Sequence, residues 1–279
     1  MANVQENPGT QRTRRNLMKM GAILSLAALQ NVSKTDPASA NCGNDKPVGR
    51  GCASGDGPNC FLKGTTIRTV SGDRKIEDLA IGDLLPTMFG GLHPIQWIGR
   101  YPRKKSDPCK PWVKDALPVR IARSALAPNV PRADLYVTGG HSLFLDGLLV
   151  PAGNLINGTS IRRDERDCDE LEFFHIKLES HDVIYAEGAP AETLCGSVNE
   201  AAINFADYLR QYGTPTREEI PCAPVIHIHG ELHGKREELK SRFRSALSPW
   251  IDLRNQADIV RDQLEERGIV LCRQSELSR

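Results

Sequence analysis

Aromatic side chains are scarce in this chain, and its charges nearly cancel. Phe, Trp and Tyr make up 5% of the 279 residues, and 36 Lys and Arg stand against 35 Asp and Glu, for a net charge of +1. Proteins that bind single-stranded nucleic acid use aromatic stacking platforms and a basic groove that follows the phosphates. Because this composition favours neither feature, we expect no nucleic-acid partner.

The sequence also lacks an apolar run long enough to cross a membrane. The uncharged N-terminal stretch, residues 20–33, falls short of the ~20 residues that a spanning helix needs. It follows the pair Arg14-Arg15 and precedes Ala38-Ser39-Ala40, which has the small residues of a cleavage site. This order predicts that residues 1–40 are an export signal of the twin-arginine type rather than an anchor helix. We therefore expect a mature chain that begins near Asn41, has no stable membrane span and is periplasmic or extracellular.

A third absence is the Cys-x-x-Cys pair, which argues against a structural zinc site or a thioredoxin-like redox pair among the eight cysteines. An exported protein can form disulfides, but the spacing does not say which cysteines pair. The best metal candidate is His227-Ile228-His229 with His233 nearby, since His-x-His on a strand points two rings to one face. No acidic ligand can be assigned to it. We therefore favour surface or packing histidines there, and expect no metal and no cofactor.

Turn residues and apolar periodicity divide the rest of the chain into three parts. Residues 41–59 are rich in Gly, Asn and Pro and predict a short flexible flank. Residues 60–195 alternate short β-branched or apolar runs with Gly, Pro and Asp turns, which predicts an all-β domain. Residues 196–279 repeat their apolar positions at helical intervals, which predicts an α-rich tail. The expected strands are 65–70, a return strand at 75–79, 95–98, 118–121, 135–138, 142–150, 173–178 and 182–186, and the expected helices are 198–212, 237–247 and 258–267.

Three motifs in the predicted β domain occur in a specific order. It opens with Cys60-Phe61-Leu62-Lys63-Gly64-Thr65, continues with Thr138-Gly139-Gly140-His141, and ends with a segment that contains His181-Asp182-Val183-Ile184-Tyr185-Ala186. In this combination the sequence resembles the Hint domain, the autoprocessing module of Hedgehog proteins and inteins, in its bacterial subtype with a Cys-Phe-x-x-Gly-Thr opening. The resemblance covers about residues 60–195 and implies an all-β Hint fold with an α-rich C-terminal appendage.

The chemistry of the opening cysteine can be argued without the family. A cysteine at the first position of a rigid domain can attack the carbonyl of the preceding residue, here Asn59, and exchange the peptide bond for a thioester. A histidine with a pKa near 6.5 can protonate the departing nitrogen. The resemblance assigns that histidine to His141 and implies that Thr138 holds the scissile peptide.

The late segment carries two further candidates. The resemblance implies that His181 assists later steps, and the neighbouring Asp182 is a possible polar partner for the site. Inteins end in His-Asn followed by Cys, Ser or Thr, whereas this sequence has Glu192-Thr193 and then Leu194, with Cys195 one position late. We therefore expect cleavage without splicing.

Two functions remain open. In the first, the chain cleaves itself at Asn59–Cys60, with its own N-terminal flank as substrate, and water, a small nucleophile or an acceptor protein takes the acyl group. In the second, it is a secreted Hint-fold module with a binding or structural role and no catalysis. The second is motivated by the short flank, residues 41–59, and by the missing His-Asn ending.

Overall fold

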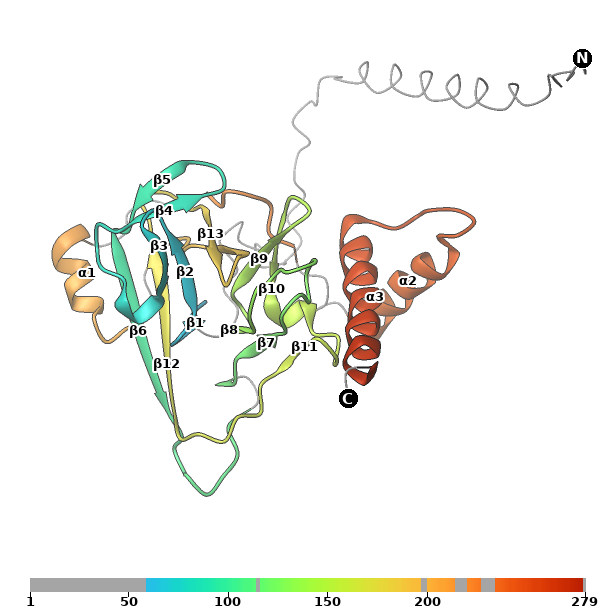
Figure 1. Ribbon diagram of the computed structural model, residues 1–279, viewed down its shortest axis with the longest axis horizontal. Coiled ribbons are helices and arrows are strands. Elements are labelled where there is room, and N and C mark those ends of the chain that lie inside the picture. Colours follow the sequence, from blue (N-terminus) through green and yellow to red (C-terminus); the bar gives the residue numbers. More distant parts are fainter. Residues whose placement is uncertain (1–58, 114–115, 197–199, 214–219, 227–233, 278–279) are drawn as a thin grey trace, which may run out of the picture. The chain divides into compact units, whose positions relative to one another are not determined.

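The computed structural model describes residues 59–113, 116–196, 200–213, 220–226 and 234–277 (Figure 1). The predicted export signal, the flank up to residue 58, and the candidate metal ligands His227, His229 and His233 lie outside the described residues.

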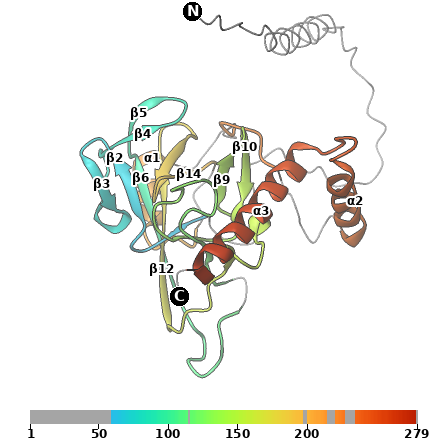
Figure 2. The ribbon, with the colours of Figure 1, turned by 45° about the vertical axis from the view of Figure 1, so that its right-hand side comes forward.

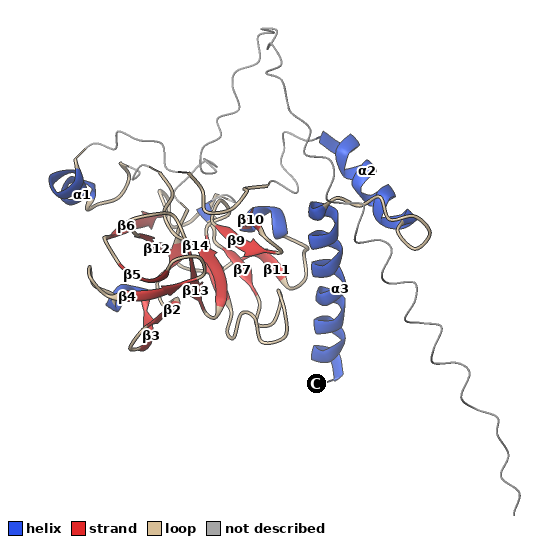
Figure 3. Cartoon of the chain, turned by 90° about the horizontal axis from the view of Figure 1, so that it is seen from above, coloured by secondary structure: helices blue, strands red, loops and turns tan. Residues whose placement is uncertain are grey.

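The described chain is mainly β, with its α-helices in the C-terminal part, which confirms the predicted fold class. Antiparallel strands, most of them short, recur throughout the region from residue 61 to residue 192 (Figure 3). One six-stranded sheet has the order β11-β7-β8-β1-β12-β6, a second has the order β10-β9-β14-β13-β2-β3, and β4 pairs with β5 alone. The strands are β1 (Phe61–Leu62), β2 (Thr66–Thr69), β3 (Gly72–Lys75), β4 (Leu84–Thr87), β5 (Gly91–Pro94), β6 (Trp97–Lys104), β7 (Val119–Ile121), β8 (Leu135–Val137), β9 (Ser142–Leu145), β10 (Leu148–Pro151), β11 (Ile161–Arg163), β12 (Glu170–Lys177), β13 (Val183–Ala186) and β14 (Ala189–Glu192); the helices are the 3₁₀ turns η1 (Ile76–Asp78) and η3 (Ala152–Leu155), and α1 (Phe205–Tyr212), α2 (Gly234–Leu247) and α3 (Gln256–Leu277).

Two of the predicted strands differ from the structure. The return strand of the first hairpin is β3, which begins at Gly72, and the predicted positions after Lys75 form η1 instead. The predicted strand 142–150 is two strands, β9 and β10, because Asp146 and Gly147 have positive φ angles of 48° and 86° and reverse the chain between them. An Asp-Gly pair with both φ angles positive is the preferred two-residue hairpin turn.

The hydrophobic core consists of two clusters of buried side chains. The larger contains alternate residues of many strands, among them Phe61, Ile67 and Leu143, and it also includes Val260 and Leu264 of α3. The smaller contains Cys60, Trp97 and Tyr208, so that α1 covers it through the contact of Tyr208 with Trp97, whose ring centroids are 5.4 Å apart. Helix α1 is shorter than predicted, and α3 is longer.

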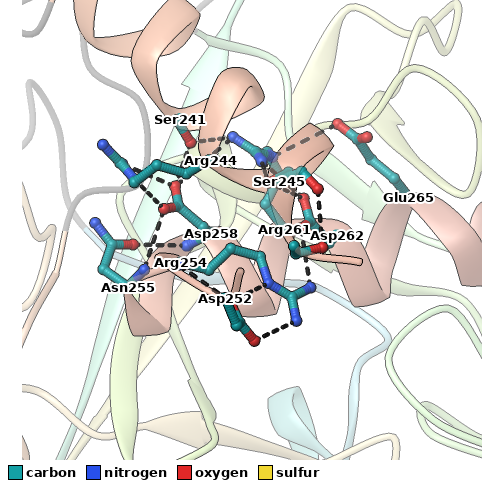
Figure 4. Close-up of polar contacts among 11 residues, drawn as sticks. Ser241, Arg244, Ser245, Asp252, Arg254, Asn255, Asp258, Arg261, Asp262 and Glu265 are labelled. Atoms are coloured by element: carbon teal, nitrogen blue, oxygen red, sulfur yellow. Dashed lines mark hydrogen bonds and ion pairs between the residues drawn. The ribbon is translucent and has the colours of Figure 1, made fainter. Parts of the chain in front are cut away.

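A polar network joins α2 to α3, which run beside each other (Figure 2). Asp258 of α3 is 2% exposed and accepts hydrogen bonds from Arg244 and Ser241 of α2, while Arg261 donates to Ser241 (Figure 4). Buried charges of this kind are tolerated only when they are paired and hydrogen-bonded. The network therefore links the two helices through ion pairs and hydrogen bonds.

Candidate active site

Cys60 lies directly before the central strand of the first sheet. Strand β1 is only two residues long, but it pairs with β8 on one side and β12 on the other, so that Phe61 is opposite both Val137 and Phe174. The Cys60 side chain is completely buried. The peptide between Asn59 and Cys60 therefore leads directly into a strand that is paired on both sides.

Thr138, which follows β8, holds Cys60 by two hydrogen bonds. The N–H of Cys60 donates to the hydroxyl oxygen of Thr138 at 2.8 Å, and the N–H of Thr138 donates to the carbonyl of Cys60 at 2.8 Å. The first of these N–H groups belongs to the Asn59–Cys60 peptide itself. Thr138 thus fixes the orientation of the peptide nitrogen that cleavage would release.

His141 is at the end of the same loop, and its ring is completely buried. The ring packs against Phe61, with centroids 4.2 Å apart, and lies 5.3 Å from the ring of His175. Burial lowers the pKa of His141 to about 3, although the nearby main chain of Asn59 partly opposes this. A pKa of about 3 keeps the ring of His141 neutral at neutral pH, so that the ring is able to accept a proton there.

The thiol of Cys60 is also held in its neutral form. Complete burial raises the pKa of Cys60 well above the ordinary thiol value, and the positive charge of Arg103 acts in the opposite direction. The thiolate is the reactive nucleophile. The site therefore rests with its nucleophile protonated and a neutral base in the same buried environment.

The structure places His181 near the site and gives Asp182 a different set of contacts. The Nδ1 atom of His181 accepts the N–H of Cys222 at 3.0 Å, and its positive charge would lower the pKa of His141. The carboxylate of Asp182 accepts the N–H groups of Phe89 at 3.1 Å and Val183 at 2.7 Å. These bonds tie the β4–β5 loop to the start of β13, which is a structural role.

Sequence reasoning gave no role to Glu192, the last residue of β14. It is 2% exposed, and its Oε1 atom accepts the N–H of Ser142 at 2.7 Å and the side-chain N–H of Asn59 at 3.2 Å. Its Oε2 atom lies 3.8 Å from Nε2 of His181. Burial raises the pKa of Glu192 to about 7, against the effect of the hydrogen bonds from Ser142 and Asn59. An acidic residue inside a strand of buried residues, at the position where inteins have histidine, was the available signal.

His175 was interpreted as a packing residue, and the structure brings it close to the catalytic candidates. It lies on β12 opposite Gly99, and its ring faces that of His141. Burial lowers its pKa well below the ordinary histidine value, with the charges of His141 and His181 acting in the same direction. His141, His175 and His181 are thus three buried histidines, and a positive charge on one disfavours a positive charge on its neighbours.

The described cysteines differ in their state. Cys195 is disulfide-bonded, so its thiol is not available to receive an acyl group. Cys60, Cys109, Cys168 and Cys222 are free thiols. Within the described ranges, no group of three His, Cys, Asp or Glu residues is arranged to hold a metal ion. No helix in that part of the chain has the length and hydropathy to span a membrane.

Comparison with known proteins places these features in a family. The family model described as "Hint domain" matches residues 59–197. Among solved structures, the chain is similar to the gp41-1 intein at 15% identity, with a TM-score of 0.35 over 48% of this chain and 98% of that chain. It is also similar to the bacterial intein-like domain from Clostridium thermocellum (15%, 0.35, 49% and 99%) and to a DnaB intein from Synechocystis sp. PCC 6803 (11%, 0.33, 49% and 99%). No curated protein matches the sequence at a significant level.

Proposed function

We propose that this chain, whose residues 59–197 belong to the Hint domain family, cleaves itself between Asn59 and Cys60 by way of a thioester. The observation that carries the proposal is the hydrogen bond from the N–H of Cys60 to the hydroxyl of Thr138, at 2.8 Å. It holds the scissile nitrogen in place within a site that also contains a buried thiol and a neutral imidazole. These are the groups that an N-to-S acyl shift requires.

In the proposed step, a proton moves from the thiol of Cys60 to the amide nitrogen by way of His141. His141 accepts the thiol proton of Cys60, and the sulfur attacks the carbonyl carbon of Asn59. As the S–C bond forms and the C–N bond breaks, the imidazolium returns the proton to the nitrogen of Cys60, which leaves as an amine. Because the pKa of His141 is about 3, the imidazolium forms only transiently, and it gives up its proton readily.

The acyl group then passes to water or to another nucleophile. An open cavity of about 790 Å³ lies beside β1 and is lined by Leu62, Arg103, Arg166 and Cys168 among others. Arg103 also acts on the charge of Cys60. A small nucleophile or a segment of an acceptor protein reaching the thioester from this side would meet the positive charge of Arg103. The other basic side chains of the lining are paired with acidic ones, Lys63 with Glu172, Lys104 with Glu170 and Arg166 with Asp164. With Cys195 in a disulfide and Leu194 at the position that receives the chain in inteins, the proposed reaction ends in cleavage rather than splicing.

The second function, a Hint-fold module without catalysis, is favoured by one observation. Cys60 is completely buried and its pKa is raised, which disfavours the reactive thiolate. In both cases we propose an exported protein, on the basis of the Arg14-Arg15 signal in the sequence.

The first experiment follows the full-length chain, Cys60→Ala and Cys109→Ala by intact mass, each with and without dithiothreitol. Cys109 is a free, exposed cysteine, so its variant is the matched control. We expect a fragment that begins at Cys60 in the parent and in Cys109→Ala, formed faster with the thiol, and no such fragment from Cys60→Ala. An uncut parent under all conditions would leave the non-catalytic module as the function.

A further inference from the structure

We propose that Glu192 and Gly140 form a subsite for the side-chain carboxamide of residue 59, so that the chain cleaves selectively after asparagine. The inference rests on the proposed function, because it names the substrate preference of the same site. It assigns Glu192 as a positioning residue, which acts on the reaction through Asn59.

The carboxylate of Glu192 is oriented by a hydrogen bond that does not involve Asn59. The N–H of Ser142 donates to Oε1 of Glu192 at 2.7 Å, which sets the orientation of the carboxylate. The same oxygen accepts the side-chain N–H of Asn59 at 3.2 Å. In its charged form, which a pKa of about 7 leaves partly populated at neutral pH, the carboxylate can only accept hydrogen bonds. This form therefore selects a residue that carries an N–H donor.

The opposite side of the carboxamide is bounded by a glycine. A methyl group added at Gly140 would lie 2.5 Å from Oδ1 of Asn59, closer than any ordinary contact. Gly140 therefore leaves room for the carboxamide that a larger residue would take. The loop that contains it also supplies Thr138 and His141, so the same loop orients the side chain and the peptide bond of the substrate.

The fit predicts that the rate of cleavage depends on the residue at position 59 and is highest with asparagine. Asparagine places its donor on Glu192 and its oxygen over Gly140. Alanine makes neither contact, so the residue at position 59 is no longer held in place. Its carbonyl carbon is then poorly positioned for attack by the thiol of Cys60. Aspartate sets a second carboxylate against Glu192, and the two like charges repel each other. Glutamine keeps the donor but is one methylene longer.

Ionisation of Glu192 offers a readout that does not depend on cleavage. Burial raises its pKa to about 7, and the hydrogen bond from Asn59 stabilises the charged form and so lowers the value. Removing the carboxamide must therefore raise the pKa of Glu192 further. The ionisable groups near Glu192 in the described part of the chain include His181, with Nε2 at 3.8 Å, and Cys222. His141, His175 and Asp182 lie beyond them.

The first test compares full-length Cys60→Ala with Cys60→Ala/Asn59→Ala by following the Glu192 carboxyl in an NMR pH titration. We expect a higher pKa for Glu192 in the double variant. Asn157→Ala is the matched control, because the Asn157 side chain bonds to Thr159, Ser160 and Leu264 instead, and we expect no change there. An unchanged pKa in Cys60→Ala/Asn59→Ala would overturn the subsite.

The second test measures cleavage rates of full-length Asn59→Ala, Asn59→Asp and Glu192→Ala, with Glu192→Gln as the conservative variant. We expect each of the first three to be slower by about tenfold or more, the factor that corresponds to one lost buried hydrogen bond. Glu192→Gln keeps an acceptor oxygen and should stay within about threefold of the parent. Equal rates for the parent and Asn59→Ala would overturn the inference alone, whereas an uncut parent would overturn the proposed function and the selectivity with it.

Discussion

Acidification should destabilise the fold through His141, because its buried ring resists protonation. Burial lowers the pKa of His141 from 6.5 to about 3, whereas in the unfolded chain the ring titrates at its ordinary value. Between these two values the unfolded state binds more protons than the folded state. The contribution of the neutral ring to stability is therefore complete above pH 6.5 and is lost as the pH falls towards 3.

The size of the effect follows from the two pKa values. Each pH unit between them corresponds to about 1.36 kcal/mol, so lowering the pH from 6.5 to 4.5 should remove about 3 kcal/mol of stability. Glu192 acts in the opposite direction, because its pKa is raised from 4.5 to about 7. The protonated carboxyl of Glu192 favours the folded state, so acidification over the same range increases the free energy of unfolding by about 3 kcal/mol. Glu192 thus offsets the effect of His141 in the parent, whereas His175, whose pKa is also lowered by burial, acts in the same direction as His141. Only a comparison of variants separates these contributions.

The assay is urea unfolding at several pH values from 7 to 4.5, in a Cys60→Ala background that cannot form the thioester. We expect the free-energy difference between this background and its His141→Gln variant to fall by about 3 kcal/mol over that range. His93→Gln, at a partly exposed position, is the matched control for the exchange of a histidine for glutamine. A constant difference for His141→Gln as well would refute the conclusion that His141 is held neutral, and with it the assignment of His141 as the proton acceptor.

Three further changes test other parts of the site and fold. Thr138→Val should slow cleavage by about tenfold or more and destabilise the fold by about 1–3 kcal/mol, because the N–H of Cys60 loses its acceptor. Thr138→Ser keeps the hydroxyl and should retain most of the cleavage rate. Both rates are measured by intact mass over time. Arg103→Met should shift the pH–rate profile of cleavage to higher pH, since the charge of Arg103 lowers the pKa of Cys60, and an unshifted profile would exclude this role. Leu264→Ala should reduce the free energy of unfolding in urea by about 2–5 kcal/mol, because Leu264 of α3 belongs to the main core, whereas a loss below about 0.5 kcal/mol would mean that α3 does not contribute to it.

The sequence predicted the features that depend on neighbouring residues. Turn residues and β-branched runs located most of the strands, and the motifs around Cys60 and Thr138-Gly139-Gly140-His141 led to the family and to the cleavage hypothesis. These patterns are local, since a turn or a strand is specified mainly by residues within a few positions of each other. Where the local pattern was ambiguous the prediction was wrong, as at β3, which begins at Gly72 rather than Lys75.

Only the tertiary structure decided which distant residues meet at the scissile bond and in which protonation state they do so. Asn59 and Glu192 are 133 positions apart and become hydrogen-bond partners because β14 pairs with β9 next to the loop that follows β8. The pKa values of His141 and Glu192 are likewise set by the removal of water around them. Burial and proximity are properties of the assembled sheets, and a side chain acquires them only when strands from the whole domain close around it.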